Sequence, residues 1–438
     1  MEAVKEKVQL QKYPAYKDSG VEWLGEIPEH WKIVRMKFLY NDYSEKNRKD
    51  AELLSVTQDK GVVPRSWVEN RMVMPSGNLE SFKYIQKGDF AISLRSFEGG
   101  LEYCHHDGII SPAYTVLKQR RNDLKSSYYK YLFKSHSFIS ELQTSVVGIR
   151  EGKNISFNEL SYSLMPIPKP EEQTAIATFL DEKCGKIDTA IAQKEKLIGL
   201  LKERKQIIIQ NAVTKGLNPE AKMKDSGVEW IGEIPEHWEV KKIKHVTNKI
   251  GSGVTPSGGG TTYLDDGIPL LRSQNVHFGN IDLEGAAKIS QAVHDSMSNS
   301  KVERGDVLLN ITGGSIGRCH YVETDEPINV NQHVCIVRPN KLISTNFLNA
   351  LLASEIGQGQ IWFFQQGGGR EGLNFQALKN FDIPYPPKNE QRKILNFLED
   401  QVKKIDQTIL LQQQQIEKLK EYKSSLIDAA VTGKIKVS

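Results

Sequence analysis

The feature that most constrains the fold of this 438-residue chain is an internal repeat. Residues 17–31 read KDSGVEWLGEIPEHW and residues 224–238 read KDSGVEWIGEIPEHW, so fourteen of fifteen positions are identical at an offset of 207. A second pair of blocks begins at Glu171 and at Asn389 and matches at an offset of 218. A repeat of this kind predicts that one structural unit is built twice.

The stretches between the repeated blocks, roughly 40–165 and 247–383, have diverged almost completely. Weak echoes remain, such as Lys-Gly-Asp at 87–89 against Arg-Gly-Asp at 304–306. Drift after a duplication is the simple explanation, but drift alone does not erase the middle of a repeat and spare its frame. The pattern therefore favours one scaffold that presents two different recognition surfaces.

Each block at offset 218 is predicted to be a long helix. Proline-rich stretches at 165–170 and 383–387 precede the two blocks, and no proline interrupts the next 45 or so residues. Apolar residues then alternate at steps of four and three, which is typical of a coiled-coil seam. The seam comprises Leu180, Cys184, Ile187, Ile191, Ile198, Leu201, Ile208 and Ala212 in the first helix and Leu398, Val402, Ile405, Ile409, Ile416, Leu419, Leu426 and Ala430 in the second.

Polar residues interrupt the two seams at matching places, Lys194 with Gln412 and Lys205 with Lys423. A single narrow apolar stripe does not stabilise an isolated helix in water, so each stripe must be buried. Two matched stripes in one chain favour an intramolecular pair, which chain order makes antiparallel. Packing of each helix on its own domain and dimerisation through the seams are the alternatives.

These observations predict an α+β fold with two globular domains and two long helices that form an antiparallel coiled coil. The expected organisation is a first globular domain at 1–170, a central long helix at 171–216, a second globular domain at 217–388 and a C-terminal long helix at 389–438. Paired tryptophans and a repeated histidine, His30 and His237, are interpreted as structural parts of the frame.

Composition excludes several classes of protein. The formal net charge is only +4, there is no run of 18 apolar residues, and the first residues, MEAVKEKVQLQKYP, lack the apolar core of a secretory signal. The four cysteines form no CxxC pair, which is typical of a reducing cytoplasm. We therefore expect a cytoplasmic protein.

Motifs of catalysis are absent from the sequence. There is no Walker A loop, no GxGxxG that opens a helix, and no GxSxG, HExxH or EF-hand pattern. The run Cys-His-His-Asp at 104–107 has no counterpart in the second half, which argues against a metal site. The chain is expected to be non-catalytic and to hold no metal or cofactor.

Proteins contact DNA through cations, which bind phosphates, and through planar hydrogen-bonding side chains, which read base edges. Both kinds occur after short apolar strands in the divergent regions, in a basic run at 118–134, and in the Arg-Glu-Gly triplets that both halves share. The candidates for DNA contact are Arg95, Ser96, Lys118, Arg120, Arg121, Arg150, Arg272, Gln274, Asn275, Thr312, Ser315 and Arg370.

The whole pattern resembles the specificity subunits of type I restriction–modification systems. The resemblance rests on SGVEWLGEIPEHW and SGVEWIGEIPEHW, on the prolines that lead into EEQTAIATFLD and NEQRKILNFLE, and on the helix ends NAVTKG and AAVTGK. It implies that each divergent region is a target recognition domain that reads one half of a bipartite DNA site. It also implies that the helices fix the gap between the half-sites.

The resemblance further implies partners and their cofactors. Two methyltransferase subunits, which bind S-adenosylmethionine and methylate adenine at N6, would dock on the helices. Two endonuclease subunits, which use ATP and Mg²⁺, would join them. Two rival interpretations stay open. One is an enzyme, either a nuclease or a methyltransferase, and the other is a coiled-coil structural adaptor without DNA specificity.

Overall fold

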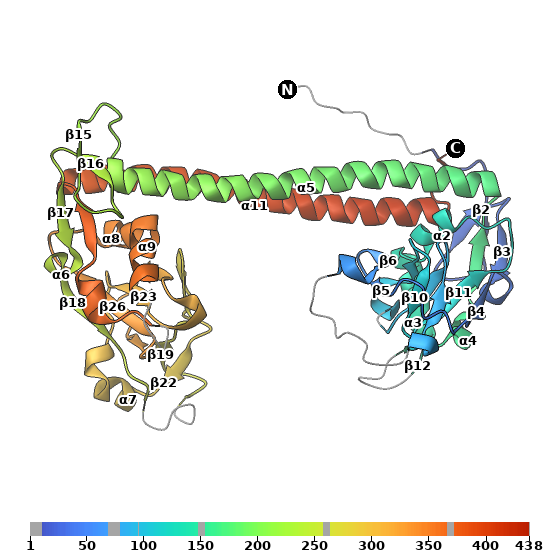
Figure 1. Ribbon diagram of the computed structural model, residues 1–438, viewed down its shortest axis with the longest axis horizontal. Helices are drawn as coiled ribbons and strands as arrows, with labels where there is room; N and C mark the ends of the chain where they lie inside the picture. Colours follow the sequence, from blue (N-terminus) through green and yellow to red (C-terminus); the bar gives the residue numbers. More distant parts are fainter. Residues whose placement is uncertain are drawn as a thin grey trace. The chain divides into compact units, whose positions relative to one another are not determined.

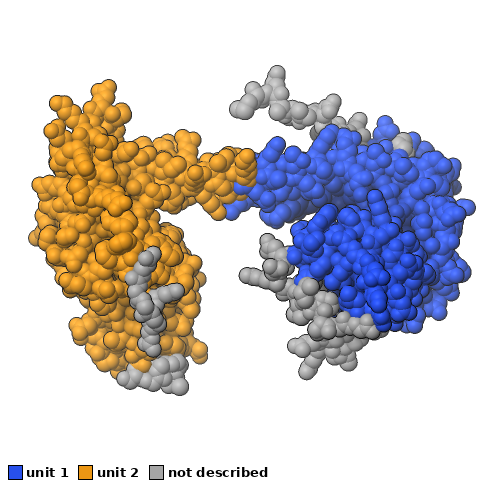
Figure 2. All heavy atoms as spheres, in the orientation of Figure 1, with its two compact units in different colours: residues 1–195, 413–438 blue, residues 196–412 orange. Residues whose placement is uncertain are grey.

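The computed structural model describes residues 11–68, 79–94, 96–147, 154–256, 263–365 and 372–437. The chain divides into two compact units (Figures 1 and 2). Unit 1 comprises residues 1–195 and 413–438, and unit 2 comprises residues 196–412. The two long helices contribute to both units, α5 at Pro170–Lys215 and α11 at Lys388–Val431.

Unit 1 is built from two short antiparallel strand pairs and one four-stranded sheet. The repeated tryptophan segment forms a hairpin of two strands, and the next strand pairs with the strand that leads into α5. A four-stranded antiparallel sheet follows, in the order β4-β11-β8-β9. These elements are β1 (Tyr16–Asp18), β2 (Glu26–Pro28), β3 (Lys32–Arg35), β14 (Leu164–Ile167), β4 (Tyr40–Tyr43), β11 (Thr115–Gln119), β8 (Phe90–Ile92) and β9 (Glu102–Tyr103).

Unit 2 repeats this plan in the same order. Its hairpin, its pair of flanking strands and its sheet of order β18-β26-β23-β24 correspond one to one to those of unit 1. The repeat predicted from sequence is therefore confirmed in the fold. The elements are β15 (Met223–Asp225), β16 (Glu233–Pro235), β17 (Glu239–Lys242), β27 (Asp382–Tyr385), β18 (Thr247–Ser252), β26 (Val334–Pro339), β23 (Val307–Asn310) and β24 (Cys319–Tyr321).

The remaining strands form small sheets of their own, apart from the two four-stranded sheets, and the remaining helices are short. In unit 1 these are β5 (Leu54–Thr57), β6 (Gly61–Pro64), β7 (Lys83–Ile85), α1 (Ser96–Gly99), β10 (Gly108–Ile110), α2 (Ser126–Leu132), α3 (His136–Thr144), β12 (Val146–Val147), β13 (Asn154–Ile155) and α4 (Phe157–Leu160). In unit 2 they are α6 (Ile243–Val246), β19 (Ile268–Leu271), β20 (Val276–His277), β21 (Asn280–Ile281), β22 (Ala287–Ile289), α7 (Gln291–Ser296), β25 (Asn329–Val330), α8 (Thr345–Ala353), α9 (Glu355–Phe364) and α10 (Phe375–Lys379).

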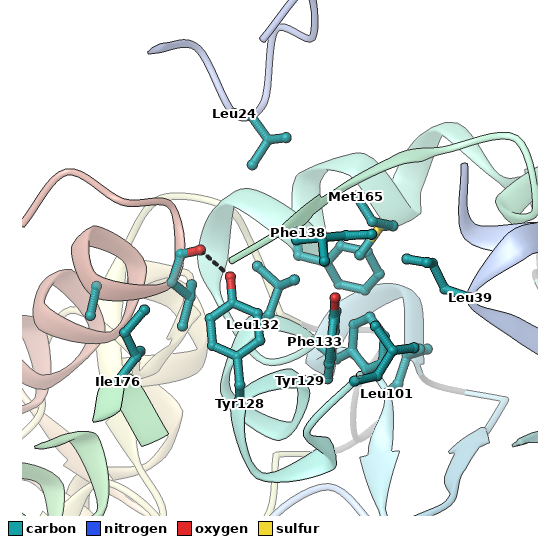
Figure 3. Close-up of a cluster of buried hydrophobic side chains, with 14 of the residues drawn as sticks. Leu24, Leu39, Leu101, Tyr128, Tyr129, Leu132, Phe133, Phe138, Met165 and Ile176 are labelled. Atoms are coloured by element: carbon teal, nitrogen blue, oxygen red, sulfur yellow. Dashed lines mark hydrogen bonds between the residues drawn. The ribbon is translucent and has the colours of Figure 1, made fainter. Parts of the chain in front are cut away.

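The core of unit 1 is closed by the far end of the chain. Tyr128 of α2 is fully buried, and its hydroxyl donates a hydrogen bond of 2.7 Å to the carbonyl oxygen of Val431 in α11 (Figure 3). Asp428 of α11 accepts hydrogen bonds from the backbone and side chain of Ser137, in the first turn of α3. Unit 1 therefore needs both the start of α5 and the end of α11.

Repeated residues fasten each long helix to its own domain. The buried amide of Gln173 bonds the backbone at Lys125 and Pro168, and its counterpart Gln391 bonds the backbone at Ser344 and Pro386. Likewise His30 lies 3.0 Å from Glu172, and His237 lies 2.7 Å from Glu390. The repeated histidines thus have carboxylate partners at the helix starts, which agrees with the structural role expected for them.

The long helices pair in antiparallel directions within each unit. In unit 2 the ammonium group of Lys205 lies 2.8 Å from the carboxylate of Asp406, and in unit 1 that of Lys423 lies 2.7 Å from Asp188. The two ion pairs join counterpart residues, because both lysines and both aspartates are related by the offset of 218. The polar interruptions of the seam therefore form cross-helix contacts that help to fix the register.

The seam residues lie between the helices as predicted. Leu180, Ile187, Leu398, Ile405, Ile409, Ile416 and Leu426 are buried, whereas Ile191, Ile198, Leu201, Ile208, Val402 and Leu419 are half-buried. The half-burial follows from the geometry of a two-helix pair, which leaves one side of each seam open to solvent. The intramolecular antiparallel coiled coil is confirmed within each unit.

The Gly-Asp pairs that both halves share, at 88–89 and 305–306, each place a buried carboxylate at the start of a strand in the four-stranded sheet. Asp306 is fully buried, and the guanidinium group of Arg338 donates to both of its carboxylate oxygens, at 2.7 and 2.9 Å. In unit 1 the strand register places Lys118 where Arg338 stands, but its ammonium group donates to Gln86 at 2.7 Å. Burial raises the pKa of the counterpart carboxyl, Asp89, to about 6.

This difference leads to a stability prediction. Arg338→Met leaves the carboxylate of Asp306 buried without its cation, which is expected to cost roughly 3–5 kcal/mol of unfolding free energy. The matched variant Lys118→Met loses one hydrogen bond to an amide and the contact of its ammonium group with the Tyr43 ring, whose centre is 4.2 Å away. It is expected to cost about 1–2 kcal/mol. Urea unfolding of the full chain measures both, and an equal loss for the two variants contradicts this assignment.

Candidate nucleic-acid interface

The candidate interface of unit 2 lies at the edge of its sheet where the strands β18 and β23 end and β26 begins. Loops at 253–256, 311–318 and 331–333 follow β18, β23 and β25, and backbone hydrogen bonds join them. The backbone amide of Gly253 donates to the backbone carbonyl oxygen of Asn331, and the backbone amide of Ile311 donates to that of His333. Loop ends that gather at one sheet edge form a surface on which side chains can face a ligand.

A buried asparagine brings a fourth loop to the same edge. The side-chain amide of Asn310, at the end of β23, donates to the carbonyl oxygens of Ser273 and Val276 at 2.7 and 3.2 Å. This contact holds the loop at 272–275 against the loop that begins at Ile311. Sequence reasoning selected both loops separately, and the structure brings them together.

Three of the predicted residues at this edge are accessible. Gln274 is exposed and has a planar amide, while Thr312 and Ser315 are half-buried on the neighbouring loop. The guanidinium carbon of Arg272 lies 5.7 Å from the centre of the Tyr263 ring, so part of its cationic surface is already occupied. Asn275 differs, because it is buried and its side-chain oxygen accepts a hydrogen bond from the backbone of Arg272.

A hydrogen-bonded cluster at this edge was missed from sequence. The hydroxyl of Thr312 and the ring nitrogen Nδ1 of His333 are 2.6 Å apart, and Nε2 of the same ring is 3.1 Å from the side-chain nitrogen of Gln332. The hydroxyl of Thr255 donates to the other end of the Gln332 amide. Gln332 is thus exposed, and these hydrogen bonds hold its side chain in place. No glycine-rich motif lies beside it in the sequence to indicate a ligand-binding loop.

A substitution tests whether this amide contributes to recognition. A side-chain amide that makes two hydrogen bonds to a base is worth about 1–3 kcal/mol of discrimination. Gln332→Ala is therefore expected to weaken selectivity at one half-site by roughly 5- to 150-fold and to leave the other half-site unchanged. The control is Gln376→Ala, an exposed glutamine of α10. Sequencing of methylated fragments measures the effect, and equal behaviour of the two variants contradicts the assignment.

The corresponding edge of unit 1 follows the ends of β4, β8 and β10. Leu94, two residues after the end of β8, is 52% exposed. The turn that contains it is closed by the Ser96 hydroxyl, which accepts a hydrogen bond of 2.9 Å from the backbone amide of Ser93. Ser96 is fully buried. Its predicted role in DNA contact is therefore not supported by its position, and the same holds for Asn275.

The three remaining predicted arginines, Arg95, Arg150 and Arg370, lie outside the described residues. The structure does locate the segment next to one of them, because Gly372 forms a bridge with Thr312. The second Arg-Glu-Gly triplet therefore ends beside the candidate interface of unit 2.

The basic run at 118–134 is dispersed over several elements and engaged in contacts. Arg121 forms two hydrogen bonds with Asp123, at 2.6 and 2.8 Å, and Lys130 lies 2.7 Å from Asp181 in α5. Arg120 is exposed and donates to a backbone carbonyl oxygen. These contacts serve the packing of unit 1, so the run is a weaker candidate for phosphate contact than the sequence indicated.

One further member of this run forms a buried ion pair. The ammonium group of Lys134 lies 2.7 Å from the carboxylate of Glu102, which has no solvent exposure. Burial raises the pKa of Glu102 to about 7, and the nearby ammonium group opposes that shift. A carboxylate in this position stabilises the fold of unit 1 through Lys134 and does not face a ligand.

The described residues provide no evident site for a metal ion. Among them no group of three or more histidine, cysteine, aspartate or glutamate side chains is arranged to bind one. In the run at 104–107 the thiol of Cys104 is buried and donates to the carbonyl oxygen of His106, and Asp107 accepts from the backbone of Lys87. Within the same described ranges, none of the helices has the length and apolar character that a membrane span requires.

Comparison with known proteins finds consistent similarity to one group of proteins. Residues 235–421 match the model of the type I restriction modification DNA specificity domain. The chain is 25% identical over 402 residues to the EcoBI specificity subunit of Escherichia coli, which covers 87% of this chain and 81% of that protein. It is 26% identical over 425 residues to the MjaVIII specificity subunit of Methanocaldococcus jannaschii, which covers 94% of each.

Solved structures share the fold. A chain from a study of complex assembly and conformational transition of the type I R-M system superimposes with a TM-score of 0.69 at 15% identity, over 92% of this chain and 98% of that one. The HsdS subunit from Thermoanaerobacter tengcongensis gives a TM-score of 0.53 at 16% identity, over 93% and 98%. By its sequence matches over nearly the whole chain, its repeated domains and its paired helices, this protein is similar throughout to the specificity subunits of type I restriction–modification systems.

Proposed function

We propose that this chain is the non-catalytic subunit that gives a type I restriction–modification complex its DNA sequence specificity. Each unit reads one half of a bipartite site, and the paired helices set the distance between the halves. One observation carries the proposal: the two sheets have the same strand order, yet the loops at their corresponding edges differ in sequence. A conserved frame with two different edges is what the recognition of two different half-sites requires.

The helices also suit a second role, which is the docking of partner subunits. Two matched helix segments offer two matched surfaces, so we expect two methyltransferase subunits that methylate adenine at N6. Two endonuclease subunits complete the complex. S-adenosylmethionine then belongs to the methyltransferase, and ATP and Mg²⁺ belong to the endonuclease. DNA is the shared substrate of these partners, which is consistent with action in the cytoplasm.

The experiment that tests this function compares DNA binding with and without the chain. The methyltransferase subunits are purified alone and in complex with this chain, and DNA affinity is measured at about 50 and about 200 mM salt. The complex is expected to bind more tightly and to lose affinity steeply with salt, since cations that contact phosphates displace counterions.

The rival functions give different results in the same experiment. An adaptor without DNA specificity leaves the DNA affinity of the methyltransferase unchanged when the chain is added. An enzyme in its own right is indicated if the isolated chain binds S-adenosylmethionine in calorimetric titration. Either result contradicts the proposed function.

A further inference from the structure

A pocket in unit 2 lies where the end of α5, the repeated hairpin and the start of α11 meet (Figure 1). Its volume is about 470 Å³, and its walls come from residues 215–221, from Pro235 and His237, and from residues 389–394. All of these residues belong to unit 2. Apolar and charged side chains both contribute to the lining, and a pocket of this size accommodates a ring-sized ligand.

The counterpart of this pocket in unit 1 holds the ring of Tyr13. The centre of that ring lies 5.7 Å from the ring centre of His30 and 6.2 Å from that of Trp31. At the offset of 207, these two residues correspond to His237 and Trp238. Tyr13 is only 6% exposed, so in unit 1 an aromatic ring is packed into the place that the pocket occupies in unit 2.

Two apolar residues complete the correspondence. Ile176 and Ile435 belong to the same buried cluster as Tyr13, and their counterparts at the offset of 218 are Ile394 and Leu217, which line the pocket. Ile435 is 7% exposed, whereas Leu217 is 42% exposed. Unit 2 therefore keeps the apolar lining of a tyrosine site and leaves part of that lining open to solvent.

The residue type and the backbone path explain why unit 2 does not fill its own pocket. The counterpart of Tyr13 is Glu220, which is exposed. Its backbone amide donates a hydrogen bond of 3.1 Å to the side-chain oxygen of Asn218, in a turn that leads from α5 to β15. In unit 1 two separate segments lie side by side at this place, with a bridge between Gln11 and Lys436, so Tyr13 can reach the site.

The rim of the pocket is more basic than its counterpart. Lys215 and Lys393 line the pocket and are exposed, and the corresponding residues of unit 1 are Gly433 and Ala175. The carboxylate of Glu390 is already engaged, since it contacts the histidine and the tryptophan of the repeated segment. The two ammonium groups therefore favour a ligand that carries a negative charge beside its ring.

We propose that this pocket binds a tyrosine side chain of a partner protein, presented on an extended segment with an acidic residue next to it. The ring takes the place that Tyr13 takes in unit 1, against His237 and Leu217. The acidic residue pairs with Lys215 and Lys393. The site uses none of the loops of the candidate nucleic-acid interface, so it is independent of how the chain reads DNA.

The test adds peptides copied from the segment that fills the site in unit 1 to the full chain. A fluorescent peptide of residues 9–17 is titrated by anisotropy in its natural form, with Tyr13→Ala and with Lys12→Glu. The Tyr13→Ala peptide is expected to bind at least about 10-fold more weakly, because it lacks the apolar ring. The Lys12→Glu peptide is expected to bind about 2- to 5-fold more tightly at low salt, because its carboxylate faces the lysines.

Variants of the chain locate the site. Lys393→Glu is expected to reverse the preference between the natural and the Lys12→Glu peptides. The matched control is Lys403→Glu, which changes an exposed lysine of α11 outside the pocket and should leave the preference unchanged. A peptide with benzoylphenylalanine at position 13 is expected to cross-link to residues 215–221 or 389–394. Thermal unfolding at the natural temperature confirms that both variants fold.

Several results overturn the inference. Failure of the natural peptide to bind does so, as does equal binding of the Tyr13→Ala peptide. A cross-link to His30 or Glu172 means that the peptide displaces the tyrosine of unit 1 and that the pocket of unit 2 is not the site. If the chain self-associates and Lys393→Glu abolishes this association, a second copy fills the pocket in place of a separate partner.

Discussion

Exchange of residues 40–165 for the corresponding region of a relative is expected to change one half of the methylated DNA site and to leave the other half intact. The exchanged segment begins at β4 and ends at β14, so it carries the reading edge of unit 1 and leaves the repeated frame in place. Unit 2 has its own core and its own loops, and these stay unchanged. Sequencing of the methylated sites gives the result directly.

The matched control is the exchange of residues 247–383, which is expected to change the opposite half-site. Gln173 and Gln391 lie outside both segments, and so do Pro168 and Pro386, whose carbonyl oxygens accept hydrogen bonds from them. Each hybrid therefore retains these two attachments of the long helices. If one exchange alters both half-sites, the two units are not independent readers.

Insertion of four residues after Lys194 and four after Gln412 is expected to lengthen the unspecified gap between the half-sites. These two positions are counterparts in the seam, so the insertions lengthen both helices of the pair by roughly 6 Å. At about 3.4 Å per base pair, the gap should grow by one or two base pairs. The half-sites themselves should not change, because no reading loop is altered.

Insertion after Lys194 alone provides the contrast. It lengthens one helix and shifts one half of its seam against the unchanged partner, so a lower unfolding free energy is expected as well as a changed gap. Methylation mapping gives the gap, and thermal unfolding gives the stability. An unchanged gap in the doubly inserted protein means that the helices do not set the spacing.

Features that depend on spacing along the chain could be predicted from sequence. The two helices begin at the proline stretches, and the polar interruption at Lys205 and Lys423 coincides with two equivalent ion pairs. Heptad periodicity is local, so the seam residues could be assigned without knowledge of the fold. The internal repeat predicted, in addition, that the two halves of the chain are structurally equivalent.

Features that depend on tertiary proximity could not be predicted. Tyr128 and Val431 are 303 residues apart, so the contribution of α11 to the core of unit 1 has no local signal. The cluster around Gln332 joins residues from separate loops, which only the sheet brings together. Ser96 and Asn275 have the residue types expected of DNA contacts, but their side chains stabilise their own turns.

The central claim is that this chain specifies one split DNA site, and a genome-wide map of N6-methyladenine tests it most directly. The map is recorded in the source strain with the gene intact and with the gene deleted. The account predicts that one motif, made of two half-sites with a fixed unspecified gap, loses its methylation on deletion and regains it when the gene is restored. Unchanged methylation in a strain whose methyltransferase still co-purifies with this chain contradicts the account.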